Sequence, residues 1–350
     1  MPAARSPSPA FIPSEKELAE LRTVKFSSLL DQDKQEMRKL LAAAEEVGFF
    51  YLDLTDDASR DLLDTLDDLK KVMADWFAQP EAIKKKTPLV TKAHGYKALG
   101  THAGVGGQRD GWEALKIGKP ELAARWALSP VVKQHLAEFD TFVSSSHFVL
   151  KVILSSLSTQ LGATGDDSLQ NFHRDDQPSK SSVFFLHYPP RSGEENIGQN
   201  MHTDLGSLTL LFAAQWGLQV LCPSESQSMH TEVQQSAGQE SMEWKFVEPR
   251  PGHAIINIGD SLRFLTKFRL RSALHRVLPL YDTDRYSVTY FLRPSDDAKF
   301  VDSDGEACDA MTWYLKKNST YESSYQAQAK SSVLLGGIQN HASIHNGIAV

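Results

Sequence analysis

The sequence predicts a mainly β protein with a helical N-terminal part. In the first half, long segments carry apolar residues at helical spacing. From about Ser181 onward, short apolar runs alternate with turn residues, which is typical of strands. Hydrophobic residues make up 41% of the 350-residue chain and charged residues 23%, so the chain holds enough apolar material for a large globular core.

The N-terminal 24 residues are predicted to form a loose arm and a short helix. The first 13 residues are rich in Pro, Ser and Ala, and Ser14 followed by Glu17 fits a capping box that opens a helix. The next helix is predicted from an apolar stripe that consists of Met37, Leu40, Leu41, Ala44 and Val47. Gly48 stands where the C-cap of that helix is expected, and a buried strand is expected from Phe49 to Leu54.

Two more long helices are predicted before the β half. One runs from about Ala58 to Phe77 and is stopped by Pro80, and the other runs from about Pro130 to Leu161. The Gly-rich, polar segment between them, from Lys92 to Gly118, is interpreted as a long surface loop. Residues 25–165 are therefore predicted to form a helical N-terminal region.

Eight short runs in the second half each have the pattern of a strand. They are SVFFLHY, SLTLLFA, LQVLC, EWKFVEP, HAIINIG, LRFLT, HRVLPLY and YSVTYFL. Eight such runs with turns between them predict a double-stranded β-helix, the jelly-roll core, over residues 181–300 and flanked by α-helices. A mobile loop is expected at 224–241, and a helix near Met311–Lys317 followed by a weakly patterned tail is expected within 301–350.

Charge and composition exclude several function classes. The net charge is −7 and no basic stripe stands out, so nucleic acid is not an expected partner. The chain has neither an apolar run long enough to span a membrane nor the apolar segment of a secretory signal at its N-terminus. Cys222 and Cys308 form no metal or redox motif; free thiols are expected, with a disulfide between them as the alternative, so the cytoplasm is the expected compartment. A monomer or weak homo-oligomer is expected.

A His-x-Asp pair in the sequence MHTDLG is the first candidate for chemistry. In an extended segment, residues two apart point to the same side, so His202 and Asp204 are able to bind one metal ion. His275, in RSALHRVLP, is the best candidate for a third ligand. Two histidines and one carboxylate leave open positions on an iron(II) ion for a chelating co-substrate and dioxygen. Such a pair also arises by chance, and a lone strand histidine is commonly a core or surface residue.

Arg285 and Ser287 follow His275 and share one face of a predicted strand. A buried cation needs a partner, and a bound carboxylate would pair with Arg285 while Ser287 adds a hydrogen bond. The competing interpretation is an outward-facing arginine in an ordinary salt bridge.

These motifs together resemble the isopenicillin N synthase-like branch of the iron(II)/2-oxoglutarate-dependent dioxygenases. The ordered set is HTD, LQVL, PGHAIINIGD, SALHRV and RYS, preceded by VGFFYL, DWFAQPEAIKKK, GYKALG, DGWEALK and LHYPP. The resemblance covers about residues 25 to 317. No single motif would suffice, but the combination is specific.

The resemblance implies a set of cofactors and roles. It implies iron(II) bound by His202, Asp204 and His275, with 2-oxoglutarate and dioxygen as co-substrates and ascorbate as an optional reductant. It further implies that Arg285 and Ser287 bind the distal carboxylate of 2-oxoglutarate.

The stretch LHYPP matches the family's co-substrate contacts only in part. The resemblance implies that the Tyr188 hydroxyl reaches the same co-substrate. Leu186 stands where the family often has Asn, so one polar contact to the co-substrate is missing here.

The resemblance also implies a reaction class. The expected substrate is a small organic molecule that is hydroxylated, desaturated or rearranged in its rings. The C-terminal tail with SSVLLGG is similar to fungal members of the family that act in secondary-metabolite biosynthesis. Arg191 is a candidate for binding an acidic or phenolic substrate, or is a solvated loop residue. Phe212 and Phe291 are candidates for lining the substrate pocket, although strand aromatics are commonly plain core.

Two alternative functions remain open at this point. One is an iron oxidase that needs no 2-oxoglutarate, of the isopenicillin N synthase or aminocyclopropane carboxylate oxidase type, which also carries Arg-x-Ser. The other is a non-catalytic binding protein on the same fold, which would be expected to have lost a metal ligand.

Overall fold

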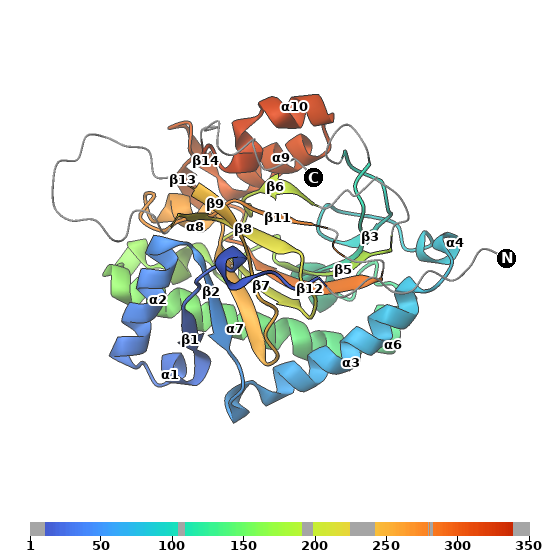
Figure 1. The fold of residues 1–350 in the computed structure, drawn as a ribbon, viewed down its shortest axis with the longest axis horizontal. Helices are drawn as coiled ribbons and strands as arrows, with labels where there is room; N and C mark the ends of the chain where they lie inside the picture. The colour runs from blue at the N-terminus through green and yellow to red at the C-terminus, as the bar shows by residue number, and fades with distance from the viewer. Residues whose placement is uncertain are drawn as a thin grey trace.

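Two β-sheets form the centre of the molecule in the computed structural model, with helices on either side (Figure 1). The structure describes residues 11–103, 109–190, 199–224, 242–278, 280 and 283–338. Helices from the N-terminal half gather on one side of the sheets, and the C-terminal helices lie on the opposite side, beside the smaller sheet.

The large sheet has eight strands and is antiparallel except for its first pair. The strands in spatial order are β1 (Thr23–Lys25), β2 (Phe49–Asp53), β10 (His253–Ile258), β7 (Leu208–Ala213), β12 (Arg285–Leu292), β5 (Ser182–Tyr188), β4 (Glu113–Gly118) and β3 (Gly95–Lys97). Strands from the N-terminal region therefore complete both edges of a sheet whose centre comes from the second half of the chain.

The smaller sheet carries four strands and lies across the cavity from the large one. In spatial order they are β6 (Gln199–His202), β11 (His275–Val277), β8 (Leu218–Pro223) and β9 (Met242–Phe246). A separate hairpin consists of β13 (Lys299–Val301) and β14 (Ala307–Asp309). The predicted jelly-roll core with flanking helices is confirmed.

The longer N-terminal helices cover the outer face of the large sheet with apolar stripes. The helices of this half are α1 (Phe26–Leu30), α2 (Lys34–Glu46), α3 (Arg60–Phe77), α4 (Glu81–Lys84), α5 (Lys119–Ala123), α6 (Pro130–Gln134) and α7 (Leu136–Leu161). The main core lies between this layer and the sheet, with α7 packed on β7 and β12. The short 3-10 turns are η1 (Glu15–Glu17), η2 (Asp57–Ser59), η4 (Gly165–Asp167) and η5 (Leu169–Phe172).

The C-terminal elements α9 (Ala310–Tyr321), α10 (Tyr325–Lys330) and η7 (Ser332–Leu335) lie beside the smaller sheet (Figure 1). Helix α8 (Asp260–Leu265) contacts β13 instead. The backbone N–H of Thr203 donates to the carbonyl of Leu334 at 3.0 Å, so η7 lies directly behind the end of β6. The expected helix near 311–317 is part of the longer α9.

Several details of the sequence interpretation are confirmed. The Ser14–Glu17 capping box forms as predicted. Gly48 follows the C-terminal end of α2 and has a positive φ of 78°. A Cβ at this position would lie 1.9 Å from the carbonyl oxygen of Arg271, so a larger residue would not fit. Nearly all of the loop expected at 224–241 lies outside the described residues.

Three element predictions are wrong. The supposed surface loop from Lys92 to Gly118 contains β3 and β4, and every residue of both strands is buried. Their lysines and acids made the segment look like a loop, but these charges are paired or enclosed inside the protein. The run LRFLT lies largely in α8 rather than in a strand. The helix predicted over 130–161 is interrupted at His135, where the backbone leaves helical geometry (φ −116°, ψ 38°).

Candidate metal centre

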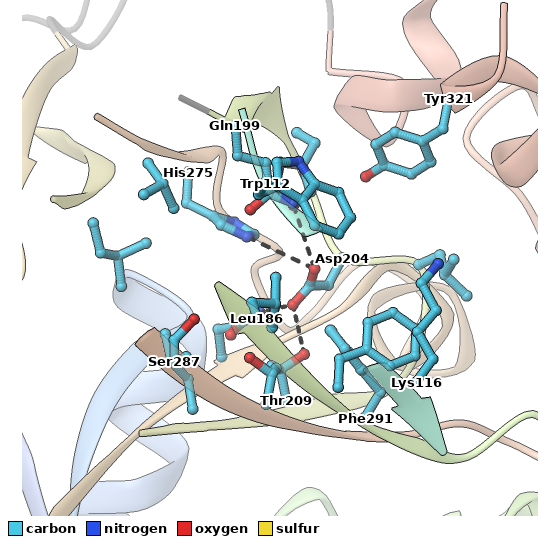
Figure 2. Close-up of a pocket in the computed structure, with 18 of the residues that line it drawn as sticks. Trp112, Lys116, Leu186, Gln199, Asp204, Thr209, His275, Ser287, Phe291 and Tyr321 are labelled. Carbon is cyan, nitrogen blue, oxygen red and sulfur yellow. Dashed lines mark hydrogen bonds and ion pairs between the residues drawn. The ribbon is translucent and has the colours of Figure 1, made fainter. Parts of the chain in front are cut away.

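Two histidines face each other at the end of the smaller sheet. His202 closes β6 and His275 opens β11, and the antiparallel register pairs them directly. Their ring centroids lie 4.3 Å apart. Asp204, two residues after His202, places Oδ1 at 3.6 Å from Nε2 of His202 and 3.7 Å from Nε2 of His275. Figure 2 shows His275 and Asp204 directed toward each other.

Both imidazoles are held in the orientation that a metal ligand requires. Nδ1–H of His202 donates to the carbonyl of Asn200 at 2.8 Å, and Nδ1–H of His275 donates to the carbonyl of Ala273 at 3.2 Å. Each Nε2 then keeps its lone pair toward Asp204. Burial and the neighbouring His202 lower the pKa of His275 to about 4, so this imidazole is neutral near pH 7.

The carboxylate of Asp204 is fixed through its other oxygen. Oδ2 accepts hydrogen bonds from Thr209 Oγ1 at 2.5 Å and from Asn257 Nδ2 at 2.8 Å. Burial opposes ionisation, but the two histidines and the hydrogen bond from Asn257 outweigh it and hold the pKa of Asp204 well below its usual range. Asn257 thus positions the carboxylate of Asp204.

This set of donors fits a catalytic divalent metal. The three candidate ligand atoms lie within 4.8 Å of one another, and all three residues are buried. Two neutral nitrogens and one carboxylate oxygen on one side of an ion are the donors used by non-haem iron(II) sites, and they leave room for further ligands.

A cavity of about 140 Å³ opens beside these ligands, between the two sheets. Alternate residues of β12 point into it, namely Arg285, Ser287, Thr289 and Phe291. Arg285 is 4% exposed; its Nε donates to the carbonyl of Trp216 at 3.2 Å, and its guanidinium lies 4.9 Å from the ring of Tyr188. Because Tyr188 and Leu186 are the register partners of Arg285 and Ser287, these four side chains line one end of the cavity.

Comparisons with known proteins agree with this geometry. Residues 179–294 match the model of the 2OG-Fe(II) oxygenase superfamily, and residues 21–133 match that of the non-haem dioxygenase in morphine synthesis N-terminal region. The chain is 46% identical to a 2-oxoglutarate-dependent dioxygenase of Gibberella zeae over 91% of this chain and 93% of that protein. The chain belongs to the 2OG-Fe(II) oxygenase superfamily.

Other relatives of this oxygenase support the same assignment. A 2-oxoglutarate-dependent dioxygenase of Glarea lozoyensis is 35% identical over 93% of this chain and 95% of that protein. Among solved structures, a full-length Neurospora crassa protein in complex with alpha-KG superposes with a TM-score of 0.67 at 19% identity, over 88% of this chain and 98% of that chain, which shows a shared fold. The protein is therefore an iron(II)- and 2-oxoglutarate-dependent dioxygenase, and the comparisons support this function rather than the oxidase alternative.

The oxygenase cavity brings together most of the residues singled out in the sequence. His202, Asp204, His275, Arg285, Ser287, Tyr188 and Phe291 all line it. The prediction for Phe212 is wrong, because side chains alternate along β7: Thr209 and Leu211 face the cavity, while Phe212 packs on Phe142 of α7 at a centroid distance of 6.3 Å. Arg191 lies outside the described residues.

Several lining residues were not anticipated. Trp112 and Lys116 come from the β4 region that was interpreted as a loop, and Arg293 follows β12 in the same alternation as Arg285. Tyr321, at the end of α9, points toward the metal ligands (Figure 2), and its ring centroid lies 5.8 Å from that of His202. The period-two pattern of EALKIG was a usable signal for Lys116, whereas no sequence pattern indicated Tyr321.

Proposed function

We propose that His202, Asp204 and His275 hold iron(II), and that the adjacent end of the cavity holds 2-oxoglutarate. The observation that carries this proposal is the convergence of two Nε2 atoms on Oδ1 of Asp204, in a cavity that also contains the buried Arg285 and Ser287. When bound, iron(II) and 2-oxoglutarate would activate dioxygen, the oxidant that allows a C–H bond of the substrate to be broken, and 2-oxoglutarate would be oxidised to succinate and carbon dioxide.

The side chains at this end of the cavity would bind and orient 2-oxoglutarate. Arg285 would pair with the distal carboxylate of 2-oxoglutarate, and the Ser287 hydroxyl would donate a hydrogen bond to it, in a buried site where a charged pair is strong. The Tyr188 hydroxyl, which contacts Gln199 at 3.4 Å, is within the same group of side chains. Leu186 offers no hydrogen bond, so we expect Arg285 and Ser287 to carry most of the co-substrate's polar recognition.

The substrate would occupy the remaining part of the cavity. Phe184, Phe291 and Leu205 provide apolar walls there, and Trp112 closes another side. We propose a small organic molecule that undergoes hydroxylation, desaturation or ring rearrangement, in the context of secondary-metabolite biosynthesis. The fungal origin of the relatives described above supports this context.

Anaerobic absorption spectroscopy tests the co-substrate site. The purified protein is loaded with one equivalent of iron(II), and spectra are taken before and after 2-oxoglutarate is added. A weak visible charge-transfer band is expected on addition, because the co-substrate chelates the metal through two oxygens. If iron binds but no band forms, the proposed co-substrate site is wrong.

We also propose that the enzyme works in the cytoplasm as a monomer or weak homo-oligomer. Cys222 and Cys308 are both free thiols, in agreement with a reducing compartment. None of the described helices is long and apolar enough to cross a membrane. Cell fractionation and the native mass in solution test the two parts of this proposal.

A further inference from the structure

The described part of the chain contains four buried lysines, and three of them are paired with a carboxylate. Lys84 lies 2.7 Å from Glu113, Lys97 lies 2.5 Å from Asp110, and Lys317 lies 2.5 Å from Asp260. The fourth is Lys116, on β4, which is 7% exposed and lines the cavity. It forms no ion pair with any described carboxylate.

The contacts of Lys116 with the described residues do not neutralise its charge. Its Nζ donates to the carbonyl of Lys92 at 3.2 Å and lies 4.7 Å from the centre of the Phe184 ring. An ammonium group has three donors, and these contacts do not replace a counterion. Glu322 attracts Lys116 from a distance, but this glutamate is half-exposed and is paired with Lys92.

A second buried cation, Arg293, lies beside the same aromatic ring. Its guanidinium is 5.9 Å from the Phe184 centroid and 5.1 Å from the Phe291 centroid. One terminal nitrogen donates to Lys180 O and to Ser182 Oγ, while its buried Nε has no hydrogen-bond partner among the described residues. Arg293 forms no ion pair with a described carboxylate either, so two enclosed positive charges converge on one wall of the cavity.

These cations lie away from the proposed co-substrate contacts. Lys116 is the register partner of Phe184 on β5, and Phe184 in turn pairs with Thr289, further along β12 than Arg285 and Ser287. In Figure 2, Ser287 and Lys116 lie on opposite sides of Asp204. 2-Oxoglutarate held at Arg285 would therefore leave Lys116 and Arg293 available to another ligand.

We propose that Lys116, assisted by Arg293, binds a carboxylate group of the organic substrate. This inference rests on the proposed function and narrows the substrate class to carboxylic acids whose apolar part fits against Phe184 and Phe291. Binding would supply the missing counterion in a site of low polarity, where an ion pair is strong, and it would fix the end of the substrate remote from the metal.

The protonation behaviour of Lys116 agrees with this role. Burial, together with the positive charges of Lys97 and Arg293, lowers the pKa of Lys116 to about 7. The protonated form of Lys116 is therefore disfavoured in the free enzyme, and an anionic ligand would stabilise this form. A lysine kept only for structure would be expected to have a carboxylate beside it, as the other three buried lysines do.

Matched acid and amide ligands test the inference. The enzyme is loaded with iron(II) and 2-oxoglutarate under nitrogen, so that the co-substrate site is filled and no turnover occurs. Dissociation constants of octanoate, hydrocinnamate, octanamide and hydrocinnamamide are measured by equilibrium dialysis. The acids are expected to bind at least about tenfold more tightly than their amides, because only the acids bring a counterion. The preference is expected to disappear in Lys116→Met and to persist in Lys116→Arg.

Two controls separate the possible failures. Lys133→Met makes the same charge change at an exposed position and is expected to keep the acid preference. The charge-transfer band is recorded in every sample, so loss of the band would contradict the proposed function, whereas a normal band without acid preference overturns only this inference. Equal binding of acids and amides by the wild-type enzyme, no binding of either acid, or an acid preference that survives in folded Lys116→Met would each overturn it. If Lys116→Met does not fold, the comparison of acid and amide binding by the wild-type enzyme still tests the inference.

Discussion

The amide Nδ2 of Asn257 donates to Oδ2 of Asp204 at 2.8 Å, across the gap between β10 and the segment that follows β6. This hydrogen bond fixes the rotation of the carboxylate and leaves Oδ1 facing the two histidines. Outer partners of metal ligands commonly set metal affinity as strongly as they set geometry. Asn257 is therefore a positioning residue for the proposed metal centre.

Asn257→Ala is expected to weaken iron(II) binding by about tenfold to a hundredfold, because the Asp204 carboxylate would rotate more freely. The measurement is an anaerobic iron(II) titration of the metal-free protein. Asn171→Ala, which removes an exposed amide far from the site in sequence, serves as the control and should leave affinity unchanged. Unaltered iron affinity in a folded Asn257→Ala protein would contradict this role.

Asp204→Ala and His202→Ala are expected to reduce 2-oxoglutarate turnover to background while leaving the fold in place. The proposed metal centre lies at the end of β6, and the main core lies on the far side of the large sheet, so neither substitution removes core packing. Succinate formation and circular dichroism are measured together, with His253→Ala as a histidine control outside the cavity. Near-normal turnover in either site variant would show that the ligand assignment is wrong.

Arg285→Ala is expected to raise the KM for 2-oxoglutarate by roughly thirtyfold or more. Removing one partner of a buried charge pair commonly costs about 2–5 kcal/mol. Arg285→Lys should be affected less, because it keeps the charge but loses the two-pronged contact. Arg269→Ala breaks a surface pair with Glu45 and should not change the KM. A wild-type KM in Arg285→Ala would assign Arg285 to a structural role.

Stability is expected to fall on acidification through His173. Burial lowers the pKa of this histidine from 6.5 to about 4, although its hydrogen bond to the Leu169 carbonyl opposes the shift. Between these pH values the unfolded chain binds the extra proton, so the stabilisation is complete above about pH 6.5 and is lost as the pH falls toward 4. His173 is expected to lower the free energy of unfolding by about 2 kcal/mol when the pH falls from 7 to 5.

Urea unfolding of the wild-type protein and of His173→Gln at the two pH values measures this effect. The glutamine side chain does not titrate, so its protein should lose about 2 kcal/mol less stability than the wild type on going from pH 7 to pH 5. Equal losses in the two proteins would show that His173 titrates alike in the folded and unfolded states.

Much of the site follows from the sequence because its parts are local. His202 and Asp204 lie two apart at a strand end, and Arg285 and Ser287 lie two apart within a strand, so strand periodicity alone places each pair on one face. The helix stripes and the strand runs of the second half were likewise readable, since apolar periodicity depends only on neighbouring residues.

The rest of the site depended on pairings between distant segments. The polar composition of 92–118 suggested a surface loop, although the segment contains two buried strands. Its charged side chains are buried because they pair with residues outside the segment, as Glu113 pairs with Lys84. The opposite orientations of Phe212 and Leu211 depended on which face of β7 meets α7. The sequence by itself determined the candidate metal ligands and the candidate co-substrate contacts. Only the tertiary structure decided that Lys116 and Arg293 share a wall of the cavity, because strand order and register are set by long-range packing rather than by local preference.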